Sequence, residues 1–341
     1  MKILFIGVNH GTSFHRYNAL KRLGHNVLLI DPCSFIPSNI VVSKWIYETG
    51  TLGFAGWIKK KVLDSIEGSN FDFCIVDGGY LISAVLVKAL KEKCRHVANF
   101  NVDDPFPNIG WRKWRLYRNS IPEYDLLVVV RRQNIEEVKF LGAKKVLHVF
   151  RMADEVAHKA VEIGAVDKAK WSSDVCFVGT WMPERGPFMA RLIERGVALS
   201  IWGDRWHKAK EWSLIKTAWR GPGIYTNDYI KPLLASKICL GLLSKGNRDL
   251  HTQRSIEIPA IGALLCAERT TEHLKMYEDG IEAVFWSDAD DCALACKKLL
   301  DHPEKRREIA KHGHKRALKN NYFNEPTLKK IIDYAMNVQI K

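Results

Sequence analysis

The stretch Val175-Cys176-Phe177-Val178-Gly179-Thr180-Trp181-Met182-Pro183-Glu184-Arg185-Gly186 decides the fold. Its first four residues form an apolar run that favours a buried strand, and Gly179 marks a turn into a segment of helical period. A strand, a turn and a helix in this order are typical of a parallel sheet wound with helices. Gly179, Thr180 and Arg185 would lie where the helix begins. Free N–H groups and a guanidinium at that point are suited to holding a diphosphate.

The same alternation of short strands and longer helical segments runs outward from this stretch in both directions. We predict strands at residues 2–8, 26–30, 73–76, 96–101, 126–130 and 145–148, and again at 175–178, 198–202, 223–225, 238–243, 263–266 and 283–285. The sequence therefore predicts an α/β protein built from two Rossmann-like doubly wound domains. Open α/β sheets bind ligands at the carboxyl ends of their strands, so we expect the ligand in a central cleft that both domains face.

The chain has 341 residues, which is long enough for two domains with their own cores. A polar interval without a strand signal separates the two alternations. We predict an N-terminal domain at residues 1–150, a linker at 151–172 and a C-terminal domain at 173–320. Residues 321–341 are expected to form a C-terminal helix that packs back on the N-terminal domain.

The composition is that of an ordinary globular protein, with 47% hydrophobic and 26% charged residues, and it excludes a disordered or disulfide-stapled chain. Lys and Arg number 52 against 38 Asp and Glu, a net charge of +14 that suits phosphate-bearing or membrane-facing partners. We expect a cytoplasmic location. The eight cysteines read as reduced, no signal peptide is recognisable, and no apolar run reaches the ~18 residues of a membrane span. No CxxC pair is present, so we expect no metal site.

Two loops of the first half carry candidate catalytic side chains. The first predicted strand runs into residues 7–13, a loop rich in small residues, where His10 would project towards a ligand and could hydrogen-bond a sugar hydroxyl; a plain surface histidine is the alternative. Asp103 and Asp104 follow another buried strand. Carboxylates at such a strand end can orient hydroxyls or serve as a general base, although one of the two can simply start the turn before Pro105.

Two tracts combine aromatic and basic side chains. Residues 111–118 hold four cations and three aromatics, and residues 202–220 repeat the combination. Such faces suit stacking on a sugar, an anionic acceptor, DNA or an anionic membrane surface, or are partly buried packing with solvated cations.

The second half contains a further constellation in which Arg254 precedes Glu257-Ile258-Pro259-Ala260 and Gly262, and Asp249 lies eight residues ahead of Glu257. With the Phe177-Val178-Gly179 and Arg185-Gly186 run, this pattern resembles the nucleotide-sugar domain of GT-B glycosyltransferases. It is most similar to the CgeB-like, spore-maturation-protein group with its group 1 glycosyl transferase C-terminal domain. Residues 101–105, Asn-Val-Asp-Asp-Pro, resemble a motif of that group's N-terminal domain.

The resemblance implies a donor nucleotide sugar, most simply a UDP-sugar, bound mainly by the C-terminal domain, with the acceptor on the N-terminal domain. Related retaining enzymes use an acid pair spaced E-x7-E, in which the second acid, here Glu257, holds ribose hydroxyls and the first touches the sugar. Asp249 stands at the first place as a shorter acid. The family's basic residue directly after the first-strand glycine is replaced by Thr180, and Arg254 or Lys245 can supply that charge.

These observations predict a metal-independent glycosyltransferase, in which cations aimed at the leaving diphosphate lower the barrier and no separate cofactor is needed. The acceptor stays open among a glycan, a lipid-linked molecule, a protein and modified DNA. Two alternatives are a DNA-modifying glycosyltransferase, favoured by the net charge and the two tracts, and a non-catalytic nucleotide-sugar or nucleic-acid binding protein.

Overall fold

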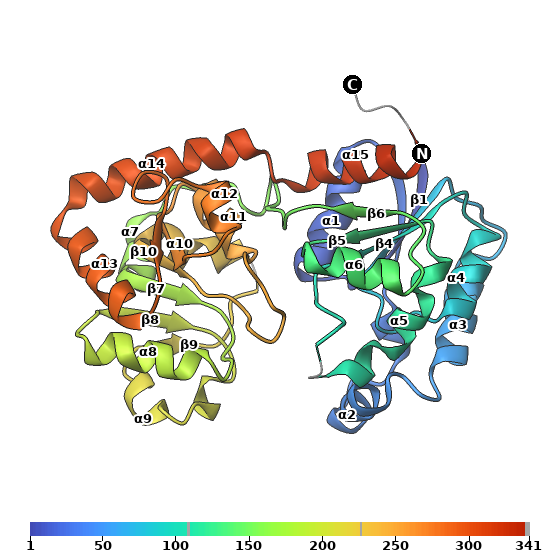
Figure 1. The fold of residues 1–341 in the computed structure, drawn as a ribbon, viewed down its shortest axis with the longest axis horizontal. Helices are drawn as coiled ribbons and strands as arrows, with labels where there is room; N and C mark the ends of the chain where they lie inside the picture. Colours follow the sequence, from blue (N-terminus) through green and yellow to red (C-terminus); the bar gives the residue numbers. More distant parts are fainter. Residues whose placement is uncertain (108–109, 226, 338–341) are drawn as a thin grey trace. The chain divides into compact units, whose positions relative to one another are not determined.

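The computed structural model describes residues 1–107, 110–225 and 227–337, and the chain forms two compact units. Unit 1 contains Met1–Phe150, Gly246–Arg248 and the segment that starts at Phe323; unit 2 contains Arg151–Lys245 and Asp249–Tyr322. Each unit is one parallel six-stranded sheet covered by helices (Figure 1). The predicted α/β class with two doubly wound sheets is confirmed.

The sheet of unit 1 has the strand order β2-β1-β3-β4-β5-β6, and its neighbouring strands pair in parallel. The order reverses direction between β1 and β3, which makes this pair the switch point where open α/β sheets bind ligands. All six predicted strands of this half are present: β1 Lys2–Ile6, β2 Asn26–Ile30, β3 Phe73–Asp77, β4 Val97–Asn101, β5 Leu126–Val129 and β6 Val146–His148.

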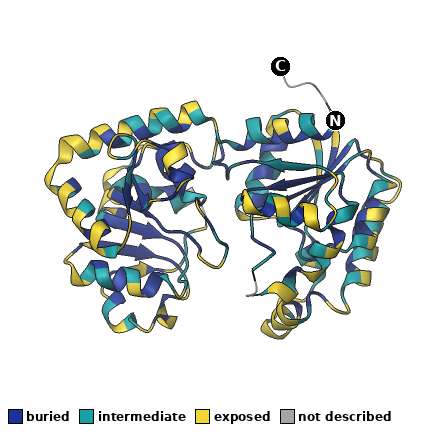
Figure 2. Ribbon diagram, in the orientation of Figure 1, coloured by how far each residue is buried: buried dark blue, intermediate teal, exposed yellow. Residues whose placement is uncertain are grey.

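Helices cover both faces of this sheet, and their apolar sides form the first core with the strands (Figure 2). The last helix, α15, packs against α1, and Arg22 at the end of α1 forms an ion pair with Glu325, with Nε 2.5 Å from Oε1. The helices of unit 1 are α1 Gly11–Arg22, η1 Pro32–Phe35, α2 Ile40–Thr49, α3 Ala55–Asp64, α4 Ala84–Lys91, η2 Trp111–Trp114, α5 Arg115–Ser120, η3 Ile121–Glu123, α6 Gln133–Phe140 and α15 Asn324–Ala335.

The sheet of unit 2 has the order β12-β11-β10-β7-β8-β9, so its switch point lies between β7 and β10. Its strands are β7 Ser173–Val178, β8 Leu199–Trp202, β9 Trp219–Gly221, β10 Ser236–Gly241, β11 Leu265–Glu268 and β12 Val284–Trp286. The strand predicted at residues 223–225 is wrong. Trp219 and Gly221 pair with β8 instead, and the amide of Gly223 donates to the Asp204 carboxylate over 2.9 Å, which holds this segment in a loop.

Residues 151–172, expected as a linker, lie within unit 2 and contain helix α7. The core of this unit gathers around Phe177, Trp206 and Trp286. Among the described residues, no helix is both long and apolar enough to cross a membrane. The helices of unit 2 are α7 Ala165–Trp171, α8 Arg185–Glu194, η4 Trp206–Lys208, α9 Trp212–Ile215, η5 Asn227–Tyr229, α10 Ile230–Ala235, α11 Arg254–Ala260, α12 His273–Met276, α13 Ala289–Asp301 and α14 Pro303–Asn320.

Candidate functional site

Arg185 lies at the switch point of unit 2 and joins the loops that follow β7 and β10. Its guanidinium donates to the carbonyl oxygen of Thr180 over 2.7 Å, and to those of Leu243 and Leu242 over 3.2 and 3.4 Å. The side chain is buried, and burial together with the neighbouring charge of Arg254 lowers the pKa of Arg185 to about 10. We therefore revise the expectation that Arg185 binds a diphosphate directly. Its guanidinium donates to backbone carbonyl oxygens and holds the loops after β7 and β10 in place.

Arg254, the first residue of α11, is the second cation at this edge of the sheet. Its Nε donates to the carbonyl oxygen of Val178, the last residue of β7, over 2.5 Å. The guanidinium carbons of Arg254 and Arg185 lie 6.0 and 5.3 Å from the centroid of the Phe177 ring. Neither terminal nitrogen of Arg254 has a hydrogen-bond partner among the described residues, and the side chain is only partly buried. Arg254 can therefore bind an anion.

Two glycines let the loops after β7 and β8 approach each other. The amide of Gly179 donates to the carbonyl oxygen of Trp202 over 2.8 Å, and the indole of Trp206 donates to the carbonyl oxygen of Gly179 over 3.0 Å. A Cβ atom on Gly203 would lie 1.9 Å from that same carbonyl oxygen. Only glycine fits at this contact, so Gly203 belongs to the construction of the site although the sequence analysis did not single it out.

Glu257 in α11 is buried and both of its carboxylate oxygens are paired. His158 Nε2 lies 3.0 Å from Oε1, and the hydroxyl of Tyr229 donates to Oε2 over 2.6 Å. The backbone N–H of Asp154 donates to His158 Nδ1, so the proton facing Glu257 is on Nε2. Burial alone would raise the pKa of Glu257, but His158, Arg254 and Tyr229 together lower it to about 2. The carboxylate is thus held as an anion inside unit 2.

Asp249 and Lys245 have partners of their own. Asp249 is buried and lies 3.1 Å from the guanidinium of Arg151. Lys245 is exposed and pairs with Glu268, at the end of β11, over 2.5 Å. The structure therefore brings Gly179, Thr180, Arg185 and Arg254 together, whereas Asp249, Glu257 and Lys245 each stand in separate ion pairs.

A second buried network lies beside Asp249. His251 accepts the backbone N–H of Arg151 at Nε2 over 3.0 Å, and its Nδ1 lies 2.5 Å from Glu272. Burial lowers the pKa of His251, which agrees with a neutral ring that accepts at Nε2 and donates at Nδ1. This network fixes the backbone of Arg151 and so positions the partner of Asp249.

In unit 1, the structure separates the roles of the two neighbouring aspartates. Asp104 is buried and receives hydrogen bonds from Asn134 and from the guanidinium of Arg248, whose Nε lies 2.6 Å away. Glu137 binds the same guanidinium, and these two carboxylates raise the pKa of Arg248. The carboxylate of Asp104 is therefore occupied by these partners, and a catalytic role for it stays a prediction. Asp103 is half-buried and no side-chain partner of its carboxylate is found among the described residues.

His10 is exposed and stands at the N-cap position of α1 without making a side-chain capping bond. The loop that carries it leaves β1 next to a cavity of about 30 Å³, which is large enough for a water molecule. Gly7, Cys33, Asp77 and Tyr80 contribute to the lining. This cavity lies at the β1/β3 switch point, where the strand order predicts ligand binding in unit 1.

The aromatic side chains of the tract at residues 111–118 are only partly exposed to solvent. Trp114 and Tyr117 are buried in the core of unit 1, whereas Trp111 is exposed. The aromatic face expected from the helical spacing is thus not one surface, because the backbone here changes from a 3-10 helix to an α-helix.

The tract at residues 202–220 mostly supports the fold of unit 2. Trp202 and Trp206 are buried, and the indole of Trp219 donates to the carbonyl oxygen of Gly203 over 3.0 Å. These rings brace the loops around Gly179 and Gly203, which leaves few of them for a DNA or membrane surface.

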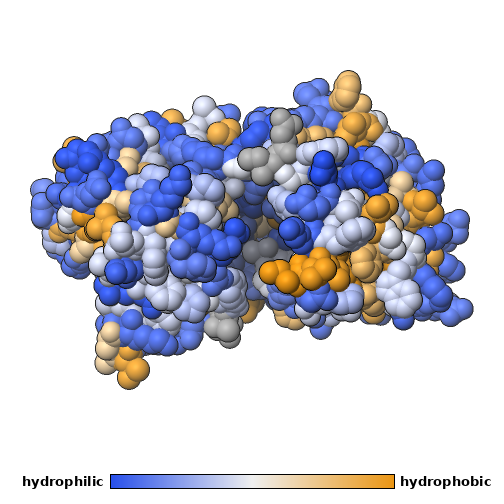
Figure 3. Space-filling view, turned by 90° about the horizontal axis from the view of Figure 1, so that it is seen from below, coloured by the Kyte–Doolittle hydropathy of each residue, from blue (hydrophilic) through white to orange (hydrophobic). Residues whose placement is uncertain are grey.

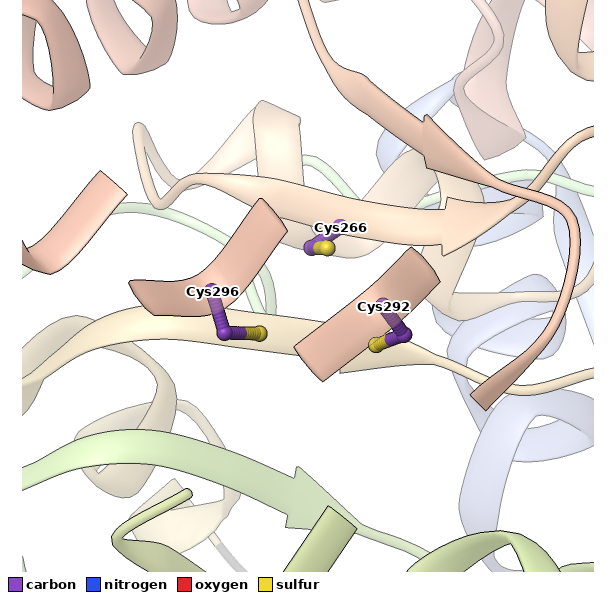
Figure 4. Close-up of side chains that lie close together, drawn as sticks. All are labelled: Cys266, Cys292 and Cys296. Carbon is purple, nitrogen blue, oxygen red and sulfur yellow. The ribbon is translucent and has the colours of Figure 1, made fainter. Parts of the chain in front are cut away.

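Three buried cysteines of unit 2 form a cluster. Cys266 comes from β11, and Cys292 and Cys296 come from α13; their sulfur atoms lie within 4.8 Å of one another (Figure 4). Three thiolates are a soft donor set for a metal ion. All three side chains belong to the apolar core, where cysteine side chains pack as small apolar groups. We assign the cluster to core packing, and the absence of a metal site stays a prediction.

Several residues of these networks escaped the sequence analysis. His158 and Arg151 lie in the predicted linker, about 100 residues before their partners, and no local spacing connects them with Glu257 and Asp249. Arg248 was likewise passed over, although a basic residue beside Asp249 in a polar turn was the available signal.

Residues 185–333 match the family model described as Glycosyl transferase-like. This glycosyl transferase-like segment begins at Arg185 and includes Lys245, Asp249, Arg254 and Glu257, whereas Gly179 and Thr180 precede it. No curated protein sequence matches the chain.

The fold is shared with solved glycosyltransferase structures. Sucrose-phosphate synthase from Thermosynechococcus elongatus superposes with a TM-score of 0.70 at 11% identity, covering 99% of this chain and 100% of that chain. Anabaena HepE in complex with UDP gives 0.67 at 11% identity, covering 98% and 100%. The E. coli trehalose-6-phosphate structure bound with UDP-2-fluoro glucose gives 0.66 at 12% identity, covering 100% of both. The two-sheet fold is that of GT-B glycosyltransferases, and with the family match it supports a transferase; membership of the CgeB-like group stays a prediction.

Proposed function

We propose that the protein transfers a sugar from a nucleoside diphosphate, UDP being favoured, to an acceptor hydroxyl. The observation that carries the proposal is the pair of guanidiniums at the β7/β10 switch point, Arg185 and Arg254, both of which belong to the glycosyl transferase-like segment. Similar folds support UDP as the nucleotide, because the Anabaena HepE structures hold UDP or UDP-glucose.

In this mechanism the departing diphosphate gains negative charge as the sugar–phosphate bond breaks. Arg254 offers terminal N–H groups to that charge, and Arg185 keeps the loops after β7 and β10 in place and adds to the positive potential. Preorganised donors of this kind stabilise the transition state because they need no reorientation during the reaction. The guanidiniums supply the charge that a divalent ion supplies in other transferases, so we expect transfer to proceed in EDTA.

The Arg254→Met variant tests the donor site. Hydrogen bonds to charged groups contribute about 1.5–3 kcal/mol, so we expect the affinity for UDP to fall by about 10- to 100-fold. Isothermal titration of the wild type with UDP, GDP, ADP and dTDP, followed by titration of the variant with the tightest nucleotide, measures the change. Arg307→Met on the exposed face of α14 is the matched control and should bind as the wild type does. A wild type that binds none of the four nucleotides, or a variant with unchanged affinity, would refute the proposed site.

We further propose that Asp103 assists the acceptor, since its neighbour Asp104 is occupied by Arg248 and Asn134. A carboxylate within reach of a hydroxyl can orient it or accept its proton, an effect worth about 10²- to 10⁴-fold. Asp103→Asn should therefore lower turnover by at least about 100-fold and leave the affinity for UDP unchanged. Steady-state kinetics with titration check this, and Asp64→Asn on exposed α3 is the control. Retained turnover in Asp103→Asn would exclude the role.

A further inference from the structure

Helix α2 of unit 1 exposes large apolar side chains on the side that faces solvent. Ile40, Val41, Trp45 and Tyr47 are exposed to 85%, 73%, 50% and 45%, and Ile46 is the buried anchor of the helix. A surface helix of a globular protein normally turns polar side chains outward and apolar ones inward. Helix α2 departs from this rule, so its outer face is suited to a partner that takes up apolar groups.

The exposed apolar surface extends beyond the helix. The indole of Trp45 donates to the carbonyl oxygen of Leu52, which is 51% exposed in the turn after α2. Helix α2 also packs against η2, whose first residue, Trp111, is 48% exposed. We call Ile40, Val41, Trp45, Tyr47, Leu52 and Trp111 the α2 surface. Figure 1 places α2 at the lower edge of unit 1. Figure 3 views the molecule from below, and it shows hydrophobic side chains gathered on that side of unit 1.

Cations surround these apolar side chains. Lys44, Arg112 and Arg115 are exposed, and residues 40–52 and 110–115 hold four basic residues against one acid. That acid, Glu48, lies 3.8 Å from the guanidinium of Arg112, so an ion pair already balances it. The local charge is therefore strongly positive around an apolar centre.

We propose that the α2 surface docks on the anionic face of a lipid bilayer. Tryptophan, tyrosine and branched aliphatic side chains enter the boundary between headgroups and acyl chains, while lysine and arginine side chains contact lipid phosphates. The cations Lys44, Arg112 and Arg115 favour an anionic lipid surface over a second copy of this chain, because two copies would bring like charges together. Docking goes beyond the proposed transfer reaction, and it would hold the protein beside a membrane-borne acceptor.

Vesicle sedimentation with the full chain tests the docking. Vesicles of phosphatidylcholine alone are compared with vesicles in which about a third of the lipid is phosphatidylglycerol, at low salt and at high salt. We expect the wild type to sediment with the anionic vesicles at low salt, and 0.5 M salt to release most of it, because salt screens exposed charges over about 3–10 Å. The double variant Ile40→Ser, Val41→Ser and the variant Lys44→Glu should each reduce the bound fraction by at least fivefold.

The matched control is Phe140→Ser, which removes a side chain that is 90% exposed on α6 of the same unit, and it should bind vesicles as the wild type does. Titration of every variant with UDP separates loss of docking from loss of the donor site, since the proposed donor site is built from unit 2 and the α2 surface from unit 1. Three outcomes would overturn the proposal: no anionic-vesicle binding by the wild type, unchanged binding by the α2 variants, or a wild-type dimer in sedimentation velocity that these variants convert to monomer.

Discussion

The Gly203→Ala variant is expected to lose about 3 kcal/mol of unfolding free energy in unit 2, the upper end of the usual cost of overpacking. The added methyl group would lie 1.9 Å from the carbonyl oxygen of Gly179 and 2.8 Å from Trp206 Nε1, and neither atom can retreat easily. The carbonyl belongs to the backbone just after β7, and the indole is buried in the core, so the loops after β7 and β8 must separate. Because these loops carry Thr180 and lead to Arg185, nucleotide binding should fail together with stability.

Urea denaturation followed by tryptophan fluorescence measures this loss. Gly56→Ala is the control, because a Cβ atom at Gly56 in α3 meets nothing within 4 Å and alanine is the better helix former. The control should be as stable as the wild type or slightly more stable. A Gly203→Ala protein that unfolds at the same urea concentration as the wild type would show that the loops after β7 and β8 leave room for a methyl group.

The Glu257→Gln variant is expected to lose about 3 kcal/mol of unfolding free energy at pH 7. The pKa of Glu257 falls from 4.5 to about 2 on folding, because His158, Arg254 and Tyr229 outweigh the burial that would raise it. A carboxyl group with a lowered pKa stabilises the fold above its unfolded pKa, and this contribution disappears as the pH falls from about 4.5 to about 2. The difference between wild type and variant should therefore be full at pH 7 and shrink steadily below pH 4.5.

Urea denaturation at pH 7 and at pH 3.5 follows both proteins, with Glu304→Gln as the control because that side chain is 88% exposed on α14. If the two proteins differ by the same amount at both pH values, the ion pair is not the source of the loss. The same variant bears on the role implied by the family resemblance. A carboxylate with both oxygens paired to His158 and Tyr229 must change partners before it can hold ribose hydroxyls, so nucleotide affinity and stability should respond to this substitution separately.

Local patterns in the sequence predicted most of the fold. Apolar runs bounded by glycine, such as residues 175–178 before Gly179, predict strands well, because such a run is recognised from neighbouring residues alone and depends on no distant partner. The strand predicted at residues 223–225 is wrong because contacts with distant residues decide the structure there. Gly223 and Tyr225 look like a short strand, but both bind the Asp204 carboxylate, and Trp219 takes the edge of the sheet through its contact with β8.

The sequence predicted some of the residues that come together at the candidate site, but not what each side chain contacts there. The run from Gly179 to Arg185 and the approach of Arg254 follow from the strand–turn–helix pattern and the resemblance. The burial of Arg185 did not follow, because its carbonyl partners at Leu242 and Leu243 come from a loop more than 50 residues away. The same holds for Glu257 and His158, whose pairing depends on how residues 151–172 return to the sheet.

The packing of α15 on α1 brings helices that are about 300 residues apart in the sequence together inside unit 1. Leu328, Ile331 and Ile332 of α15 are buried, so a fragment that stops at residue 150 would leave their binding face on unit 1 bare. Anyone who wishes to produce this unit alone should graft residues 323–337 onto the fragment through a short artificial connector.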